Sequence, residues 1–267
     1  MRFLLSKIIS ANIYNKLSPA IRKSIFKIFK IFFVKTDLQN LPGTNHPLSL
    51  NLKDELNKFN NFNLSKDIPF ISYSHLADLL KIYSKFNKQN KVNLLDFGAG
   101  NLELFAFLNK EIKKINYFYY DQLDYRTIMS KIKKKKKLKN FYVVDNKSFK
   151  KNKYDIVYFG GSLQYINNYK SEIKKIFKKS KYIIIAQTPF FYNSKIKKDI
   201  ILKQVNLSKE INYLYLINLE NFLNFMKKNN YYLISKNYNR VIKFLNFKNL
   251  KRKFNNIDMY DLVFEKK

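Results

Sequence analysis

From residue 92 onward, short apolar runs alternate with segments whose apolar residues recur at helical spacing. Runs rich in β-branched and aromatic residues predict strands, and a recurrence of about 3.6 residues predicts helices between them. This alternation is typical of parallel strands that are joined by right-handed crossovers and covered by helices on both faces. The expected strands span residues 92–97, 115–121, 140–145, 154–160, 181–187, 231–238 and 258–265, and the expected helices span 72–86, 101–112, 124–137, 169–179 and 218–228.

The end of this pattern differs from the rest, because no clear long helix separates the predicted strands at 231–238 and 258–265. Since a crossover between parallel strands is usually a helix, we expect one of these terminal strands to be antiparallel. The predicted fold class is therefore α/β, with a Rossmann-like, doubly wound and mostly parallel sheet. In such a sheet the ligand lies at the carboxyl ends of the strands, beside the first strand.

Residues 1–34 show another pattern, in which apolar and basic residues interleave and acids are almost absent. The charges recur too often for a membrane-spanning segment, and the apolar stretch is too short and interrupted for a secretory signal. The pattern predicts a basic amphipathic helix, or a pair of helices, that lies on an anionic membrane surface. The alternative is a helix that packs on the domain or on a second subunit.

Residues 37–66 contain Pro42, Gly43 and many polar residues, which predict a linker with at most one short helix near residues 52–59. We therefore divide the chain into an amphipathic extension with its linker over residues 1–65 and a main domain over residues 66–267. A chain of 267 residues that is 46% hydrophobic can bury a full core.

The charge and the rare residue types limit the function classes. The formal net charge is +33, but lysines occur in nearly every segment, so most of the excess is attributed to a solvated surface. Nucleic acid therefore stays open as a partner without being favoured. Cysteine is absent, which fits a cytoplasmic location, with contact on the inner face of the membrane through residues 1–34 as an alternative. His46 and His75 stand far apart, so no metal site is expected.

Glycine is scarce, and its placement is the most informative feature of the composition. The chain has 5 glycines, whereas average usage of roughly 7% would give about nineteen. Four of them form two close pairs, Gly98 with Gly100 and Gly160 with Gly161, and each pair ends an apolar run. The first pair follows the strand at 92–97, where the backbone must turn sharply and leave room for a ligand.

Five predicted strands end in polar or glycine residues, and their ends meet at one edge of the sheet. Asp121 follows Asp96 by 25 residues, close to the separation of about 20 that is expected of a carboxylate that binds ribose hydroxyls. The strand ends are Asp96 to Asn101, Asp121 with Gln122, Asp145 with Asn146, Gly160 to Tyr165, and Gln187 to Pro189.

Glu103 helps to choose between cofactors. A dinucleotide-binding loop would place its third glycine at this position, where the amino terminus of the helix receives a pyrophosphate. A carboxylate there would repel a pyrophosphate, but it is compatible with a cofactor that carries a positive sulfonium and no phosphate. The sequence therefore favours S-adenosylmethionine over a nicotinamide dinucleotide.

The segment from Asp96 to Gly100 resembles motif I of class I S-adenosylmethionine-dependent methyltransferases. Residues 119–122, 155–166 and 187–190 are similar to a subfamily of methyltransferases that is found in bacterial surface-polysaccharide gene clusters, and the resemblance covers roughly residues 90–240. It implies a seven-stranded Rossmann-like sheet with an antiparallel last strand, S-adenosylmethionine as cofactor, and a sugar, a polysaccharide or another small polar acceptor.

The resemblance also implies roles for individual residues. The expected cofactor-binding residues lie at the first four of the expected strand ends. Gly98 and Gly100 would lie near the methionine part, Asp121 would hold the ribose, Asp145 would border the adenine, Gly161, Ser162 and Gln164 would form the floor near the reacting methyl, and Asp96, Asn101 and Gln122 complete the set.

Three functions are open at this point. The first is methyl transfer to a sugar or another small polar acceptor, and the second is methylation of RNA. The third is a methyltransferase-like protein that has lost its activity and serves in binding or assembly, because Leu102 and Glu103 stand where motif I often has another glycine. The sequence singles out no catalytic residue, although His75, Gln164, Tyr165 and Thr188 are candidates by position.

Overall fold

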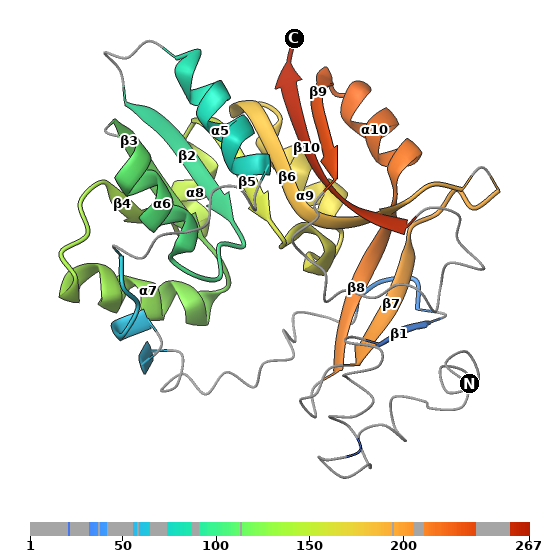
Figure 1. Ribbon diagram of the computed structural model, residues 1–267, viewed down its shortest axis with the longest axis horizontal. Coiled ribbons are helices and arrows are strands. Elements are labelled where there is room, and N and C mark those ends of the chain that lie inside the picture. The colour runs from blue at the N-terminus through green and yellow to red at the C-terminus, as the bar shows by residue number, and fades with distance from the viewer. Residues whose placement is uncertain are drawn as a thin grey trace.

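The computed structural model describes residues 32–36, 38–41, 56–57, 59–64, 74–86, 91–112, 114–193, 195–205, 211–238 and 257–267, together with Ile21. In this part of the chain ten strands form one sheet, with helices on both of its faces (Figure 1). Seven of the strands form the predicted doubly wound sheet, and three further strands extend it.

The seven strands follow the spatial order β4-β3-β2-β5-β6-β10-β9. The five strands from β2 to β6 run parallel to one another, and β10 runs antiparallel to both β6 and β9. The fold class is therefore confirmed, including the antiparallel last strand. The bounds are β2 (Val92–Phe97), β3 (Ile115–Tyr120), β4 (Phe141–Val143), β5 (Tyr154–Gly160), β6 (Ser180–Phe191), β9 (Tyr231–Tyr238) and β10 (Ile257–Lys266).

Helices cover both faces because the strands are apolar on both sides. Along β2, Leu94 packs into one buried cluster with residues of α5, α6 and α7, whereas Leu95 and Phe97 pack into a second cluster with residues of α8, α9 and α10. Among the described residues, the short α8 and a 3-10 helix over Leu163–Tyr165 were not expected from the sequence. The bounds are α5 (Ser74–Ser84), α6 (Glu103–Glu111), α7 (Leu123–Lys135), α8 (Asn146–Lys151), α9 (Tyr169–Ile176) and α10 (Leu219–Lys227).

The sequence did not predict that β6 continues past residue 187. Along one edge, β6 pairs with β5 as far as Ala186, and its residues Phe190 and Phe191 then pair with β8 (Ile211–Asn218). Pro189 lies inside β6 beside Met259 of β10, and a proline normally marks the end of a central strand. From β8 the sheet continues through β7 (Ile200–Val205) to β1 (Phe32–Lys35), in two antiparallel pairings.

The predicted amphipathic extension lies largely outside the described residues. Ile21 is helical, as expected, but Phe32–Lys35 form a strand of the sheet rather than the end of a helix. Of the short helix expected near 52–59, the described residues Leu56, Asn57 and Phe59 are helical. None of the described helices is long and apolar enough to span a membrane.

Candidate functional site

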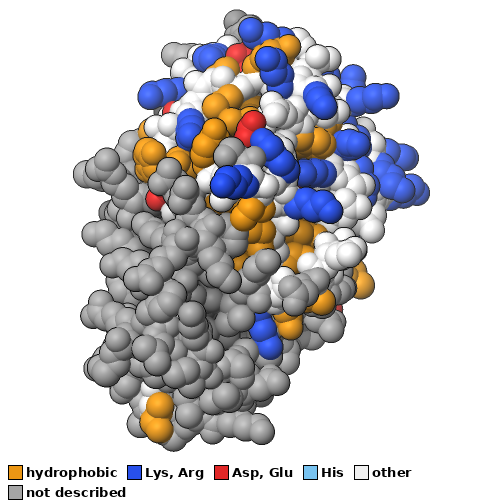
Figure 2. Space-filling view, turned by 90° about the vertical axis from the view of Figure 1, so that its right-hand side faces the viewer, with side chains coloured by type: hydrophobic (Ala, Val, Ile, Leu, Met, Phe, Trp, Pro, Cys, Tyr) orange, Lys and Arg blue, Asp and Glu red, His pale blue; other side chains and the backbone are white. Residues whose placement is uncertain are grey.

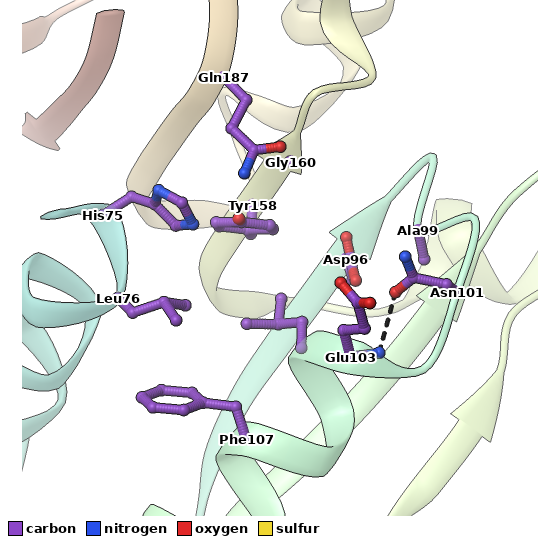
Figure 3. Close-up of a pocket in the computed structure, with 11 residues that line it drawn as sticks. His75, Leu76, Asp96, Ala99, Asn101, Glu103, Phe107, Tyr158, Gly160 and Gln187 are labelled. Carbon is purple, nitrogen blue, oxygen red and sulfur yellow. Dashed lines mark hydrogen bonds between the residues drawn. The ribbon is translucent and has the colours of Figure 1, made fainter. Parts of the chain in front are cut away.

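An open cavity lies at the carboxyl ends of β2 and β5 and beside Gln187 of β6, with residues of α5 and α6 in its wall (Figure 3). The position is the one predicted for the ligand of a doubly wound sheet. The cavity is lined by His75, Leu76, Asp96, Ala99, Asn101, Glu103, Leu104, Phe107, Tyr158, Gly160 and Gln187.

Asp96 brings a carboxyl group into the buried wall of the cavity. It lies on β2 and is 3% exposed, and Oδ2 accepts a hydrogen bond from the Tyr117 hydroxyl on β3. Burial raises the pKa of Asp96 to about 7, the Tyr117 hydrogen bond opposes this rise, and the charge of Asp121 adds to it. Asp96 therefore changes its charge near neutral pH, and an ionised Asp96 favours a positively charged ligand.

The first glycine turn joins β2 to the predicted ribose-binding carboxylate. Gly98 and Gly100 have φ angles of 71° and 63°, which L side chains rarely adopt. The N–H of Gly100 donates to Oδ2 of Asp121 over 2.7 Å, and the N–H of Gln122 donates to Oδ1 over 2.7 Å. The structure thus brings the carboxylate of Asp121 against the glycine loop.

The second glycine pair meets the first at the end of β5. A Cβ atom on Gly98 would lie 2.6 Å from Cβ of Ser162, whose hydroxyl donates to the carbonyl of Phe97 over 2.6 Å. Gly161 has a φ of 69°, and its carbonyl accepts a hydrogen bond of 2.8 Å from the Gln164 side chain. Ser162 therefore holds the two glycine turns against each other, and Gln164 is buried as a support behind them.

Helix α6 begins at the cavity. The side-chain oxygen of Asn101 accepts a hydrogen bond of 2.9 Å from the N–H of Glu103, the first residue of the helix. Both side chains line the cavity, so a carboxylate occupies the place where a dinucleotide-binding fold receives a pyrophosphate.

Of the ten predicted site residues, Asp96 and Asn101 are among those that line the described cavity. The other eight lie outside this lining, and they are Gly98, Gly100, Asp121, Gln122, Asp145, Gly161, Ser162 and Gln164. Gln122 precedes α7, and the exposed Asp145 caps α8, because its Oδ1 accepts the N–H of Ser148 over 2.6 Å. The backbone hydrogen bond from Ser148 lowers the pKa of Asp145. Both residues still lie at carboxyl ends of strands, on the Asp121 side of the site.

Among the four candidates for a catalytic role, only His75 lines the cavity. Gln164 and Thr188 are buried, and the Thr188 hydroxyl donates to the carbonyl of Ala186. Asp261 was not expected at the site from the sequence, but its Oδ2 lies 3.1 Å from Nδ1 of His75. Its signal in the sequence is a carboxylate in the middle of β10, directly between the apolar residues Tyr260 and Leu262.

The charge of the cavity is opposite to that of the chain. The cavity wall includes Asp96 and Glu103, and none of the described residues that line it is Lys or Arg, although the chain has 52 of them. Figure 2 shows Lys and Arg side chains over much of the described surface on one face of the molecule. Among the described residues no group of three His, Asp or Glu side chains could hold a metal ion.

No protein-family model matches the sequence, and neither does any curated protein. Among solved structures, the chain is similar to the 1,6-didemethyltoxoflavin N1-methyltransferase of Burkholderia thailandensis with bound 1,6-didemethyltoxoflavin and S-adenosylhomocysteine. The TM-score is 0.51 and the identity 8%, over 88% of this chain and 94% of that chain. The magnesium protoporphyrin IX methyltransferase of Synechocystis has a TM-score of 0.48 and 9% identity, over 82% of this chain and 92% of that chain. The first similarity shows that this chain has the Rossmann-like fold of class I methyltransferases.

Proposed function

We propose that this chain is an S-adenosylmethionine-dependent methyltransferase. The observation that carries the proposal is the acidic cavity in a strongly basic chain, at the strand edge where this fold binds its ligand. S-adenosylmethionine carries a sulfonium and an ammonium group and no phosphate, so two carboxylates without a lining Lys or Arg suit it. The same wall would repel the pyrophosphate of a dinucleotide.

The residues around the cavity fit the parts of this cofactor. Asp96 would attract its positive charges, and Asp121 would bind the ribose hydroxyls with charge-assisted hydrogen bonds. When bound, the cofactor supplies an electrophilic methyl group. The other expected contacts are Gly98, Gly100 and Asn101 near the methionine part, Gln122 and Asp145 toward the adenine, and Gly161, Ser162 and Gln164 near the methyl.

Binding of the product S-adenosylhomocysteine tests the cofactor. We expect it to raise the melting temperature of the intact chain at millimolar concentration, whereas NAD does not. Asp121→Ala should abolish the shift. Asp124→Ala is the matched control, because Asp124 is an exposed carboxylate three residues further on, and it should keep the shift. Stabilisation by NAD alone would refute the proposal.

For the acceptor, we propose a sugar, a polysaccharide precursor or another small polar molecule, which the sequence resemblance supports. Contact of residues 1–34 with the inner face of the membrane would suit a lipid-linked acceptor. The test is transfer of tritium from methyl-labelled cofactor to UDP-N-acetylglucosamine, to a lipid-linked oligosaccharide and to total tRNA. Label in a glycan supports the proposal, and label in tRNA that falls with rising salt would support the RNA alternative instead. Cofactor binding without transfer to any of the three would favour the inactive alternative.

A further inference from the structure

His75 and Asp261 form a buried pair at the edge of the cavity. His75 lies in the first turn of α5 and Asp261 in β10, and 3.1 Å separate Nδ1 of the ring from Oδ2 of the carboxylate. Their side chains are 3% and 0% exposed. A carboxylate that is withdrawn from water in this way needs partners that hydrogen-bond to it.

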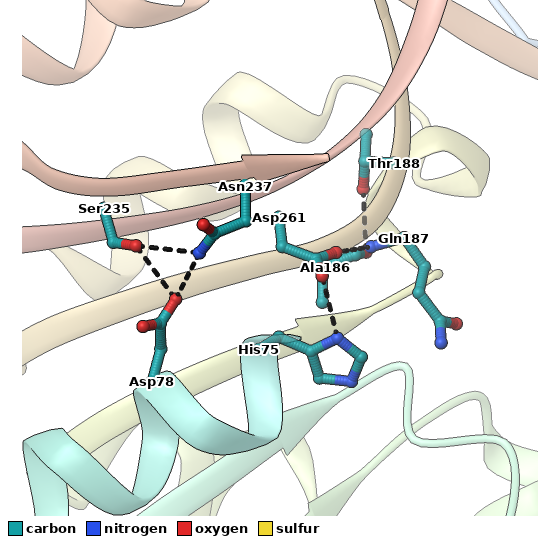
Figure 4. A network of polar contacts seen from close by, with 8 residues as sticks. All are labelled: His75, Asp78, Ala186, Gln187, Thr188, Ser235, Asn237 and Asp261. Atoms are coloured by element: carbon teal, nitrogen blue, oxygen red, sulfur yellow. Dashed lines mark hydrogen bonds and ion pairs between the residues drawn. The ribbon is translucent and has the colours of Figure 1, made fainter. Parts of the chain in front are cut away.

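The second oxygen of Asp261 is also engaged. Oδ1 accepts the backbone N–H of Gln187 over 2.8 Å. Gln187 has a φ of 53°, and the pairing of β6 with β10 shifts register at this point. A backbone N–H can only donate, so Oδ1 of Asp261 is held as an acceptor. Figure 4 shows the carboxylate between Gln187 and the ring of His75.

This arrangement selects one tautomer of the histidine. Because an ionised carboxylate only accepts hydrogen bonds, Nδ1 of His75 must carry the ring proton, and Nε2 of the neutral ring then carries the lone pair. His75 lines the cavity, and Figure 3 shows its ring directed toward Tyr158, with 5.8 Å between the ring centroids. A nitrogen lone pair on the cavity side of the ring is what a general base requires.

We propose that His75 is the general base of the methyl transfer and that Asp261 positions it. This inference rests on the proposed function. The acceptor oxygen or nitrogen forms a bond to the methyl carbon while the carbon–sulfur bond breaks, and sulfur keeps the electron pair. The acceptor proton passes to Nε2 of His75. Asp261 stabilises the imidazolium that results, and the Gln187 N–H keeps the carboxylate in place.

The tautomer can be measured without any ligand, because the chain has only 2 histidines. In the His46→Gln variant labelled with nitrogen-15 histidine, His75 is the one remaining histidine, so all histidine ring signals belong to it. We expect long-range nitrogen–proton correlation spectra of the neutral ring to show the proton on Nδ1. A proton on Nε2 would overturn the proposal.

Asp261→Asn should reverse the tautomer. The Gln187 N–H still needs an acceptor, so the amide oxygen of Asn turns to it and the NH₂ group faces His75, which forces the ring proton to Nε2. Asp78→Asn is the matched control. Asp78 is a buried carboxylate on the same helix, and it accepts hydrogen bonds of 2.9 Å from Ser235 and Asn237 rather than from His75 (Figure 4). This control should leave the tautomer unchanged, and a reversal in both variants would contradict the proposed pairing.

His75→Gln distinguishes a role of His75 as general base from a role in binding the cofactor. We expect its affinity for S-adenosylhomocysteine to stay within about twofold of wild type, while kcat for the acceptor found in the tritium screen falls about 10²- to 10⁴-fold. Lost affinity would mean that the ring holds the cofactor, and an unchanged kcat would mean a structural role, so either result overturns the proposal. If the wild-type chain does not bind S-adenosylhomocysteine, the proposed function fails instead, and the tautomer result still stands.

Discussion

The cavity and the outer surface of this molecule have opposite charges. Lys and Arg side chains cover much of the described surface on the face shown in Figure 2, whereas the described wall of the cavity has two carboxylates and no Lys or Arg. Charge that is spread over every segment says little about function, because solvated lysines are tolerated almost anywhere on a surface. The acidic cavity wall is informative because it differs from the basic rest of the chain, and an acidic cavity selects a positively charged ligand.

The largest expected effect concerns the backbone of the cavity wall rather than its charge. Gly98→Ala combines a positive φ with a Cβ only 2.6 Å from Ser162, whereas Gly100→Ala has a positive φ but no atom within 4 Å of its Cβ. Left-handed strain of about 1–2 kcal/mol applies to both, and overpacking of about 1–3 kcal/mol applies to Gly98 alone. Urea unfolding should therefore show the larger loss of stability for Gly98→Ala. Equal losses of stability in the two variants would mean that Ser162 moves away from the added methyl group at little cost.

The next effect is the pH dependence of Asp96. Its pKa in the folded chain is about 7, above its ordinary value of 3.8, so between these values the folded state binds more protons than the unfolded state. Stability without ligand should fall as the pH rises through this window, by up to about 1.4 kcal/mol per pH unit. Asp96→Asn should remove the slope, and Asp124→Asn should retain it. The same ionisation should make S-adenosylmethionine bind more tightly at pH 8 than at pH 6, as titration calorimetry can measure.

Glu103→Lys tests the charge comparison directly, because it places a cation in the cavity. We expect it to weaken binding of S-adenosylmethionine by roughly tenfold through charge repulsion. S-adenosylhomocysteine lacks the sulfonium charge, so its affinity should change less. Glu111→Lys at the other end of α6 reverses an exposed charge that does not line the cavity, and it should change neither affinity. If Glu103→Lys and Glu111→Lys weakened binding of S-adenosylmethionine equally, the net charge of the chain, and not the charge in the cavity, would determine the affinity.

The smallest effect is expected on the surface. Lys134→Gln together with Lys135→Gln removes two exposed charges from the last turn of α7. Because water and salt screen charges at such a distance, the affinity for S-adenosylmethionine should change less than twofold at physiological ionic strength. A larger change would mean that the surface charge contributes to cofactor binding.

The sequence predicted the seven-stranded sheet because its strands are apolar runs rich in β-branched and aromatic residues, and most of them are separated by segments with helical spacing. It predicted the glycine turns and Asp121 because these follow directly after strands. It did not predict β7 and β8. It also predicted an end of β6 near Pro189, yet the proline lies inside the strand opposite Met259.

Asp261 could not be assigned to the site from the sequence. Its partner His75 is 186 residues away in the chain, and the register shift that turns Gln187 toward it arises only from the pairing of β6 with β10. Asp145 shows the opposite case, because its place after a strand suggested a ligand contact and its carboxylate caps α8. Local pattern therefore identified the strand ends, and tertiary pairing decided which side chains face the cavity.

The order of the strands also bears on how the chain folds. β10 lies between β6 and β9 in the sheet, although it follows both in the sequence, and β9 pairs with no other strand among the described residues. β9 therefore cannot join the sheet until β10 has docked, and this docking requires contacts of long sequence separation, which form slowly. Since β10 also carries Asp261, the acidic half of the His75 pair is assembled in the same late step, after the glycine loop and Asp121 can already have formed.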